Sequence, residues 1–135
     1  MANTKDLKPK VQRMMNAFLA ASLKAGIRLI VTQGFRSIAE QDAIYAQGRT
    51  KPGKVVTQAR GGQSFHNFGL AFDVCGFDGK KVHYDLDWNK LGELGKSIGL
   101  EHGDRGYTDL PHFQFRNGHT LADIQKGHYK PEEFA

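Results

Sequence analysis

Two segments of the sequence carry histidine and carboxylate side chains in a pattern typical of a metal site. His66 and Asp73 lie seven residues apart in the first segment, and Asp109 and His112 lie three residues apart in the second. The two imidazoles of His66 and His112 and the carboxylate of Asp73 suit zinc, and three protein ligands leave a fourth coordination position open. Zinc held in this way acidifies a water molecule and polarises a peptide carbonyl. The residue types therefore predict one zinc ion per chain and a hydrolytic reaction.

Hydrolysis of a peptide bond also needs a base that takes a proton from the attacking water and passes it to the leaving amine. Asp109 precedes the proposed ligand His112 by three residues, so we expect its carboxylate to approach that water. Residue types and spacing alone leave a structural interpretation open, because a lone histidine or aspartate is more often structural or solvent-facing. Surface or packing roles are expected for the remaining histidines, which are His83, His102, His119 and His128.

Residues 69–74 are predicted to form a strand with two different faces. Successive side chains of a strand point to opposite sides, so alternate residues share a face. The positions expected in the core are Leu70, Phe72 and Val74. The positions on the other face are Gly69, Ala71 and Asp73. Two small residues followed by a carboxylate are typical of the floor of a cleft.

The second segment divides in the same way. Residues 112–116 alternate, with Phe113 and Phe115 expected in the core and with His112 and Gln114 on the opposite face. The seven-residue spacing would not place both residues of the first segment on one face of a straight strand. A turn before residue 70 is therefore required to bring His66 beside the carboxylate.

The surrounding elements indicate an α+β fold. A helix is expected at residues 11–23, where apolar residues recur at helical spacing. A second helix is expected to follow the capping box formed by Ser37 and Glu40. A third is expected at residues 88–98, between Asp87 and Gly99. Shorter elements are expected to be strands at residues 27–32 and 81–84, a loop at 50–63 and a final helix after Thr120. We therefore expect a small antiparallel sheet with flanking helices.

Length and composition are those of one compact domain. The chain has 135 residues, of which 39% are hydrophobic and 24% charged, which excludes general disorder. Cys75 is the single cysteine, so neither an intramolecular disulfide nor a thiolate zinc cluster can form. A net charge of +5 favours an anionic partner such as nucleic acid, a membrane surface or a wall polymer.

No run of apolar residues approaches the roughly 18 that a membrane span requires, and the first residues are polar. We therefore expect synthesis in the cytoplasm without a signal peptide.

Several motifs together resemble the VanY-like family of D-alanyl-D-alanine carboxypeptidases and L-alanyl-D-glutamate peptidases. The two metal motifs read Ser64-x-His66-x-x-Gly69-x-Ala71-x-Asp73 and Asp109-x-x-His112-Phe113. Upstream motifs read Gln33-Gly34-Phe35-Arg36-Ser37, Glu40-Gln41 and Tyr45-Ala46-Gln47-Gly48-Arg49-Thr50. The last of these is similar to the L-alanyl-D-glutamate branch found in small phage endolysins.

The resemblance implies a hedgehog/VanY-like fold and assigns roles to particular residues. It implies that the zinc ligands are His66, Asp73 and His112, and that Asp109 is the general base. It further implies that Arg36 contacts a substrate carboxylate or the developing oxyanion, work suited to a guanidinium. Ser64 and Gln41 are expected to line the substrate cleft. Two positions depart from the family pattern: Gln114, where relatives often have glutamate, and His102, where many carry an aromatic residue.

The implied function is a zinc endopeptidase that cleaves the L-alanyl-D-glutamate bond of the peptidoglycan stem peptide. Residues 1–135 are expected to act as one monomeric domain without a separate wall-binding domain. A phage endolysin that reaches the wall through a membrane hole made by another protein fits these expectations.

Two alternatives remain. One is a D-alanyl-D-alanine carboxypeptidase, which shares the metal and the base but differs in the substrate pocket. The other is a basic nucleic-acid-binding module, although the Lys and Arg residues are scattered and form no recognised nucleic-acid motif.

Overall fold

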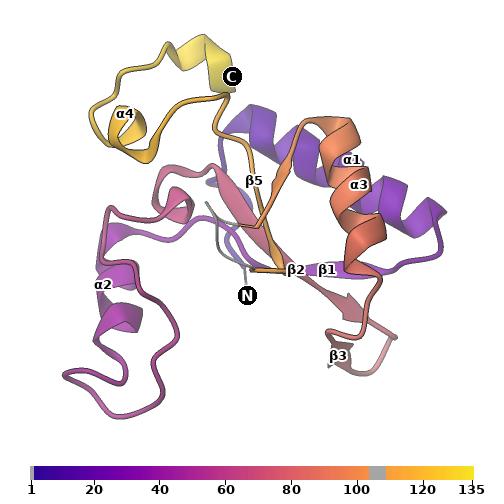
Figure 1. Ribbon diagram of the computed structural model, residues 1–135, viewed down its shortest axis with the longest axis horizontal. Coiled ribbons are helices and arrows are strands. Elements are labelled where there is room, and N and C mark those ends of the chain that lie inside the picture. Colours follow the sequence, from indigo (N-terminus) through magenta and orange to yellow (C-terminus); the bar gives the residue numbers. More distant parts are fainter. Residues whose placement is uncertain (1, 104–108) are drawn as a thin grey trace.

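The computed structural model describes residues 2–103 and 109–135. Their elements, in chain order, are α1 (Pro9–Lys24), β1 (Leu29–Gln33), α2 (Ile38–Ala46), the 3₁₀ helix η1 (Phe65–Phe68), β2 (Ala71–Phe77), β3 (Val82–His83), α3 (Trp88–Ile98), β4 (Glu101–His102), β5 (His112–Gln114), α4 (Leu121–Gln125) and the 3₁₀ helix η2 (Pro131–Phe134). Figure 1 shows α1 and α3 together on one side of the sheet, while α2 and the loop after it extend away from them. In the described part of the chain, no helix is both long and apolar enough to cross a membrane.

The described residues contain one five-stranded sheet in which the observed pairings are antiparallel. The order is β1-β2-β5-β4, and β3 also pairs with β2, so β2 is the central strand. The register between β2 and β5 places Asp73 opposite His112 and Phe72 opposite Phe113. This register brings two of the three proposed metal ligands face to face.

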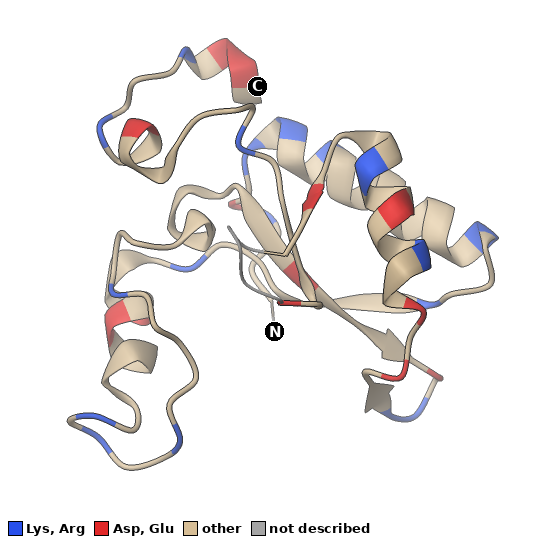
Figure 2. Cartoon of the chain, viewed as in Figure 1, with Lys and Arg blue, Asp and Glu red and all other residues tan. Residues whose placement is uncertain are grey.

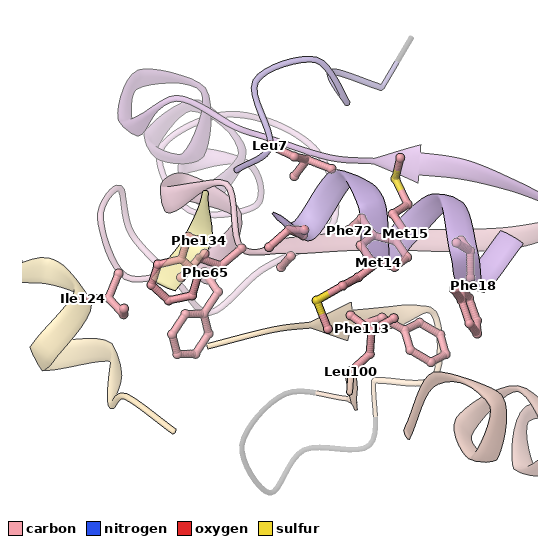
Figure 3. Close-up of a cluster of buried hydrophobic side chains, with 14 of the residues drawn as sticks. Leu7, Met14, Met15, Phe18, Phe65, Phe72, Leu100, Phe113, Ile124 and Phe134 are labelled. Carbon is pink, nitrogen blue, oxygen red and sulfur yellow. The ribbon is translucent and has the colours of Figure 1, made fainter. Parts of the chain in front are cut away.

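The core lies between the sheet and the pair of helices α1 and α3 and extends to residues of α4 and η2, and Figure 3 shows part of it. Phe18 of α1 packs against Phe113 of β5 with ring centroids 4.5 Å apart, and Phe72 of β2 lies 6.0 Å from the same ring. All three side chains are fully buried. The apolar face of each site-bearing strand is therefore fixed by close packing, and the opposite face is left for polar groups.

Helix ends follow the capping residues predicted from the sequence. The carboxylate of Asp87 accepts the backbone N–H of Lys90 at the start of α3, and Gly99 ends this helix with φ of 104°. Ser37 and Glu40 form the predicted capping box of α2, and Thr120 caps α4. The predicted α+β architecture, with a small antiparallel sheet and flanking helices, is confirmed.

The structure corrects the bounds of several predicted elements. The strand expected at residues 69–74 begins at Ala71 and continues to Phe77, and the strand expected at 112–116 ends at Gln114. The elements η1, β4 and η2 were not predicted. Such short elements span too few residues to produce a recognisable apolar period.

The N-terminal segment ties together two loops that lead to the site. The backbone N–H of Phe35 donates to the carbonyl of Asn3 at 2.8 Å, and the N–H of Lys8 donates to the carbonyl of Gly69 at 2.9 Å. A side chain at residue 34 would collide with the Asn3 carbonyl, so this close approach requires Gly34. Residues 3–8 therefore hold the backbone that follows β1 and the backbone at the end of η1.

Candidate metal centre

Three side-chain atoms converge on one point at the polar face of the sheet. Asp73 Oδ1 lies 3.2 Å from His66 Nε2 and 3.1 Å from His112 Nδ1, and the ligand atoms of the three residues all lie within 4.8 Å of one another. A tetrahedral zinc site with bonds of about 2.0–2.1 Å separates its ligand atoms by about 3.3 Å. The spacing of the three atoms therefore fits a zinc ion.

His66 is held in the tautomer that a metal requires. It lies in η1, which Ser64 caps and which ends at Gly69 in the left-handed conformation, with φ of 72°. The ring Nδ1 lies 2.8 Å from the carbonyl oxygen of Gly34, so Nδ1 carries the hydrogen and donates it. The other nitrogen, Nε2, is buried and forms no hydrogen bond within the described residues. A bare lone pair this close to a carboxylate oxygen is repulsive unless a cation lies between them.

His112 directs its Nδ1 toward the same point as His66 Nε2. Its Nε2 lies 2.7 Å from Oε1 of Gln114, and the nitrogen of that amide donates to Glu101 at 3.2 Å. Since the amide oxygen can only accept, His112 Nε2 carries the hydrogen in this contact. This leaves Nδ1, 3.1 Å from Asp73 Oδ1, to coordinate a cation.

Asp73 is held in its charged form. Burial of its carboxyl group favours the neutral form, but its contacts with the rings of His112 and His66 outweigh burial and hold the pKa of Asp73 well below its ordinary value. An ionised carboxylate and two imidazoles form the donor set of a catalytic zinc site. In the parts of the chain that the structure describes, these three residues are the group suited to hold a metal ion.

Arg36 is built into the backbone next to this centre. Its N–H donates to the carbonyl of His66 at 3.1 Å, and its own carbonyl accepts the side-chain amide of Asn67 at 3.1 Å. Burial lowers the pKa of Arg36, while the carboxylates of Asp73 and Asp109 act to raise it. The buried Nε hydrogen has no acceptor within residues 2–103 and 109–135. The guanidinium is thus a fixed donor beside two carboxylates.

Gln41 lies beneath Arg36. Its side chain is 0% exposed, in contrast to its expected place in the lining of the cleft. Its Oε1 accepts Nη1 of Arg36 at 2.9 Å, and its Nε2 donates to the carbonyl of Ala59 at 2.9 Å. These bonds use the amide to orient the guanidinium. Ser64 is half-buried, and its hydroxyl oxygen accepts the backbone N–H of His66 at 3.2 Å.

Asp109 lies at the start of the turn that leads into β5. Its backbone carbonyl accepts the N–H of His112 at 3.1 Å, and its side chain is exposed. The carboxylate lies near enough to Arg36 to act on the pKa of the guanidinium. Asp109 therefore lies close to both the guanidinium of Arg36 and the backbone of His112.

The remaining histidines lie outside this centre. His102 stacks on Phe113, with ring centroids 4.5 Å apart and planes 10° apart, and it lies against Gly92 of α3. The position that departs from the family pattern therefore has a packing role. His119 pairs with Glu133 at 2.9 Å, and His128 is exposed. The buried thiol of Cys75 lies outside the ligand group.

Two contributors were missed at the sequence level, the carbonyl of Gly34 and the side chain of Asn67. The two positions differ in how far the sequence could have revealed them. A backbone carbonyl has no sequence signal. Asn67, which is buried, lies inside the first metal motif, so its position was a usable signal.

The chain is similar to known cell-wall peptidases. The family described as VanY: D-alanyl-D-alanine carboxypeptidase matches residues 4–101. The peptidoglycan L-alanyl-D-glutamate endopeptidase CwlK of Bacillus subtilis (strain 168) is 42% identical over 122 residues, covering 81% of this chain and 73% of the relative.

Two crystal structures share the fold. The L-Ala D-Glu endopeptidase ChiX of Serratia marcescens is 23% identical, with a TM-score of 0.61 and coverage of 91% of this chain and 87% of that one. The vancomycin resistance D,D-pentapeptidase VanY, an E175A mutant in complex with Zn(II), is 17% identical, with a TM-score of 0.63 and coverage of 95% and 83%.

The geometry predicts that the protein binds one zinc ion per chain. We expect His66→Ala, Asp73→Ala and His112→Ala each to lose tight binding, because each removes one of three ligands. Zinc content after dialysis, measured by atomic emission, and zinc affinity, measured by competition with a chromophoric chelator, check this expectation. His128→Ala, which alters an exposed histidine, is the matched control. Stoichiometric zinc in all three ligand variants would contradict the assignment.

Proposed function

This chain belongs to the VanY family, and on that premise we propose that it is a zinc-dependent endopeptidase that cleaves the L-alanyl-D-glutamate bond of the peptidoglycan stem peptide. The observation that carries the hydrolytic part of the proposal is the convergence of His66, Asp73 and His112 with two lone-pair nitrogens directed at one carboxylate oxygen. The zinc(II) in the VanY structure of the same fold supports the choice of metal.

The choice of bond rests on sequence similarity. CwlK, at 42% identity, is named for L-alanyl-D-glutamate endopeptidase activity, whereas ChiX and VanY, below 25% identity, are similar in fold. The alternative is a D-alanyl-D-alanine carboxypeptidase, which the description of the family supports.

The proposed reaction assigns separate tasks to the side chains at the centre. Zinc, when bound, would acidify the attacking water and polarise the scissile carbonyl. The Asp109 carboxylate takes the proton of that water and delivers it to the leaving amine. The Arg36 guanidinium donates to the developing oxyanion or to a carboxylate of the substrate, and Gln41 fixes its direction. Ser64 retains a hydroxyl hydrogen to donate to the substrate.

We also propose that residues 1–135 act as one catalytic unit and as a monomer, in a lytic role like that of small phage endolysins. The positive charge of the chain would favour anionic polymers of the envelope. Figure 2 shows Lys and Arg on α1, α3, the loop after α2 and the C-terminal segment, without a continuous basic strip along one element. This spread favours general attraction over a nucleic-acid-binding groove.

Digestion of purified peptidoglycan tests the proposed bond. We expect the zinc-loaded protein to release fragments whose new amino terminus is D-glutamate, identified by mass spectrometry after labelling of free amines. Loss of terminal D-alanine without a new D-glutamate terminus would indicate the carboxypeptidase instead. A salt-sensitive shift of duplex DNA with no wall hydrolysis would contradict both peptidase functions.

Replacing Asp109 by asparagine separates the base from the metal ligands. We expect Asp109→Asn to lower peptidoglycan turnover by about 10²–10⁴-fold, because the amide cannot accept the proton. Zinc content should remain that of the wild type. Turnover and zinc content measured on the same sample check both statements, and Asp85→Asn controls for loss of one exposed carboxylate. Loss of zinc with activity would make Asp109 a ligand, and unchanged turnover would remove it from the reaction.

Replacing Arg36 by lysine tests the directed guanidinium. Lysine keeps the positive charge but lacks the planar set of donors, so Arg36→Lys should lower kcat/KM by about tenfold or more, with zinc content unchanged. Steady-state turnover of a soluble stem-peptide fragment gives the measurement. The control is Arg28→Lys, where the guanidinium lies over the ring of Phe77 instead. Wild-type efficiency in Arg36→Lys would show that charge alone suffices.

A further inference from the structure

A line of four side chains leads from the protein surface to the metal ligand His112. Arg116 binds Glu101 through two hydrogen bonds, Nε to Oε1 at 2.8 Å and Nη2 to Oε2 at 3.0 Å. The Nε2 amide of Gln114 donates to the same Oε1 of Glu101 at 3.2 Å. Gln114 Oε1 lies 2.7 Å from His112 Nε2. The four residues span β4, β5 and the segment that follows β5.

Each link in this line allows one direction of hydrogen bonding. A guanidinium can only donate and an ionised carboxylate can only accept, so the pair of Arg116 and Glu101 fixes an acceptor at the edge of the sheet. The NH₂ group of Gln114 must then face Glu101, which turns the amide oxygen toward the imidazole. That oxygen accepts the Nε2 hydrogen of His112 and leaves Nδ1 with a lone pair.

The opposite orientation of the amide would disable the ligand. If the NH₂ group of Gln114 faced the ring, it would donate to Nε2 and favour a hydrogen on Nδ1, where Asp73 would accept it. A protonated Nδ1 cannot coordinate a metal ion. The direction of this neutral amide therefore favours or disfavours coordination by His112, beside the contact of Nδ1 with Asp73.

We propose that Gln114 is a positioning residue that holds His112 in its metal-binding tautomer, and that the surface pair of Glu101 and Arg116 sets the direction of its amide. This inference rests on the proposed zinc site and adds a means by which residues outside the cleft control metal affinity.

Packing and register support this role. Gln114 is 1% exposed, so it cannot exchange its partners for water, and Glu101 is its direct partner across the antiparallel pair of β4 and β5. His112 and Gln114 are two residues apart on the same face of β5. Arg116 is itself anchored, since its Nη1 donates to the carbonyl of His119 at 2.9 Å. Three of the four residues therefore lie in paired strands, and the fourth, Arg116, is held by a hydrogen bond to the backbone.

The first experiment reads the position of the ring hydrogens in metal-free protein, independently of zinc and of activity. Long-range ¹⁵N–¹H correlation spectra of the histidine rings distinguish a protonated ring nitrogen from a bare one. We expect His112 Nε2 to carry a hydrogen in the wild type and in Gln114→Glu, whose carboxylate still accepts. In Gln114→Met, at a pH where the ring is neutral, the hydrogen should move to Nδ1. In Glu101→Gln we expect a mixture of the two tautomers of His112, with the hydrogen on Nε2 or on Nδ1.

The second experiment measures zinc affinity by chelator competition. Loss of a hydrogen-bond partner of a ligating histidine typically costs about 10–100-fold in metal affinity, which is the loss expected for Gln114→Met. Glu101→Gln should lose less, because its amide can still present an oxygen to Gln114. Gln114→Glu should bind zinc at least about tenfold more tightly than Gln114→Met. Glu93→Gln, on the exposed face of α3, removes a carboxylate outside the line and should match the wild type.

Thermal unfolding of each metal-free variant shows whether that variant is folded. If Gln114→Met does not fold, the variants Gln114→Glu and Glu101→Gln still test the inference. A bare Nε2 on His112 in the metal-free wild type would overturn the inference. So would unchanged zinc affinity in Gln114→Met together with Glu101→Gln. A wild type that carries the Nε2 hydrogen but binds no zinc would instead contradict the proposed function.

Discussion

Three electron-rich atoms from His66, Asp73 and His112 are held so close together that they repel one another unless a cation lies between them. Burial prevents water from relieving this repulsion, since His66 and His112 are each 3% exposed. Opposing hydrogen bonds at the far nitrogens, to the Gly34 carbonyl and the Gln114 amide, prevent the rings from turning away. The hydrogen bonds and the packing around these three residues therefore keep the three atoms close together.

The guanidinium of Arg36 and the residues of the candidate metal centre are joined by one network of hydrogen bonds. The backbone of Arg36 bonds directly to that of His66, and Asn67 and Gln41 join the same network from η1 and α2. Positions of reacting groups within a fraction of an ångström matter to catalysis, because misplacement loses most of the advantage of a preorganised site. The polar network supplies this precision on one side of the sheet, while the aromatic packing of α1 and β5 supplies it on the other.

The residues that converge at the candidate metal centre and most long elements could be predicted from the sequence, because side-chain alternation in both strands separates apolar from polar positions. Helix caps at Ser37, Asp87 and Thr120 carry local signals that the structure confirms. The turn that brings His66 back could only be assumed, since η1 is a single 3₁₀ turn without a periodic pattern. Gln41 was predicted to line the cleft, and its burial depends on the loop at Ala59, whose path no local pattern specifies.

The pairing of Asp73 with His112 across β2 and β5 is the same pairing that stacks Phe72 near Phe113. A slip of one residue would turn every side chain of the strand to the other face, so that Phe72 or Val74 replaced the carboxylate. A mispaired chain would then lose its aromatic packing and the group of three residues suited to a metal ion together. On the proposed function, binding of zinc during biosynthesis would stabilise the chains in which β2 and β5 pair in the correct register.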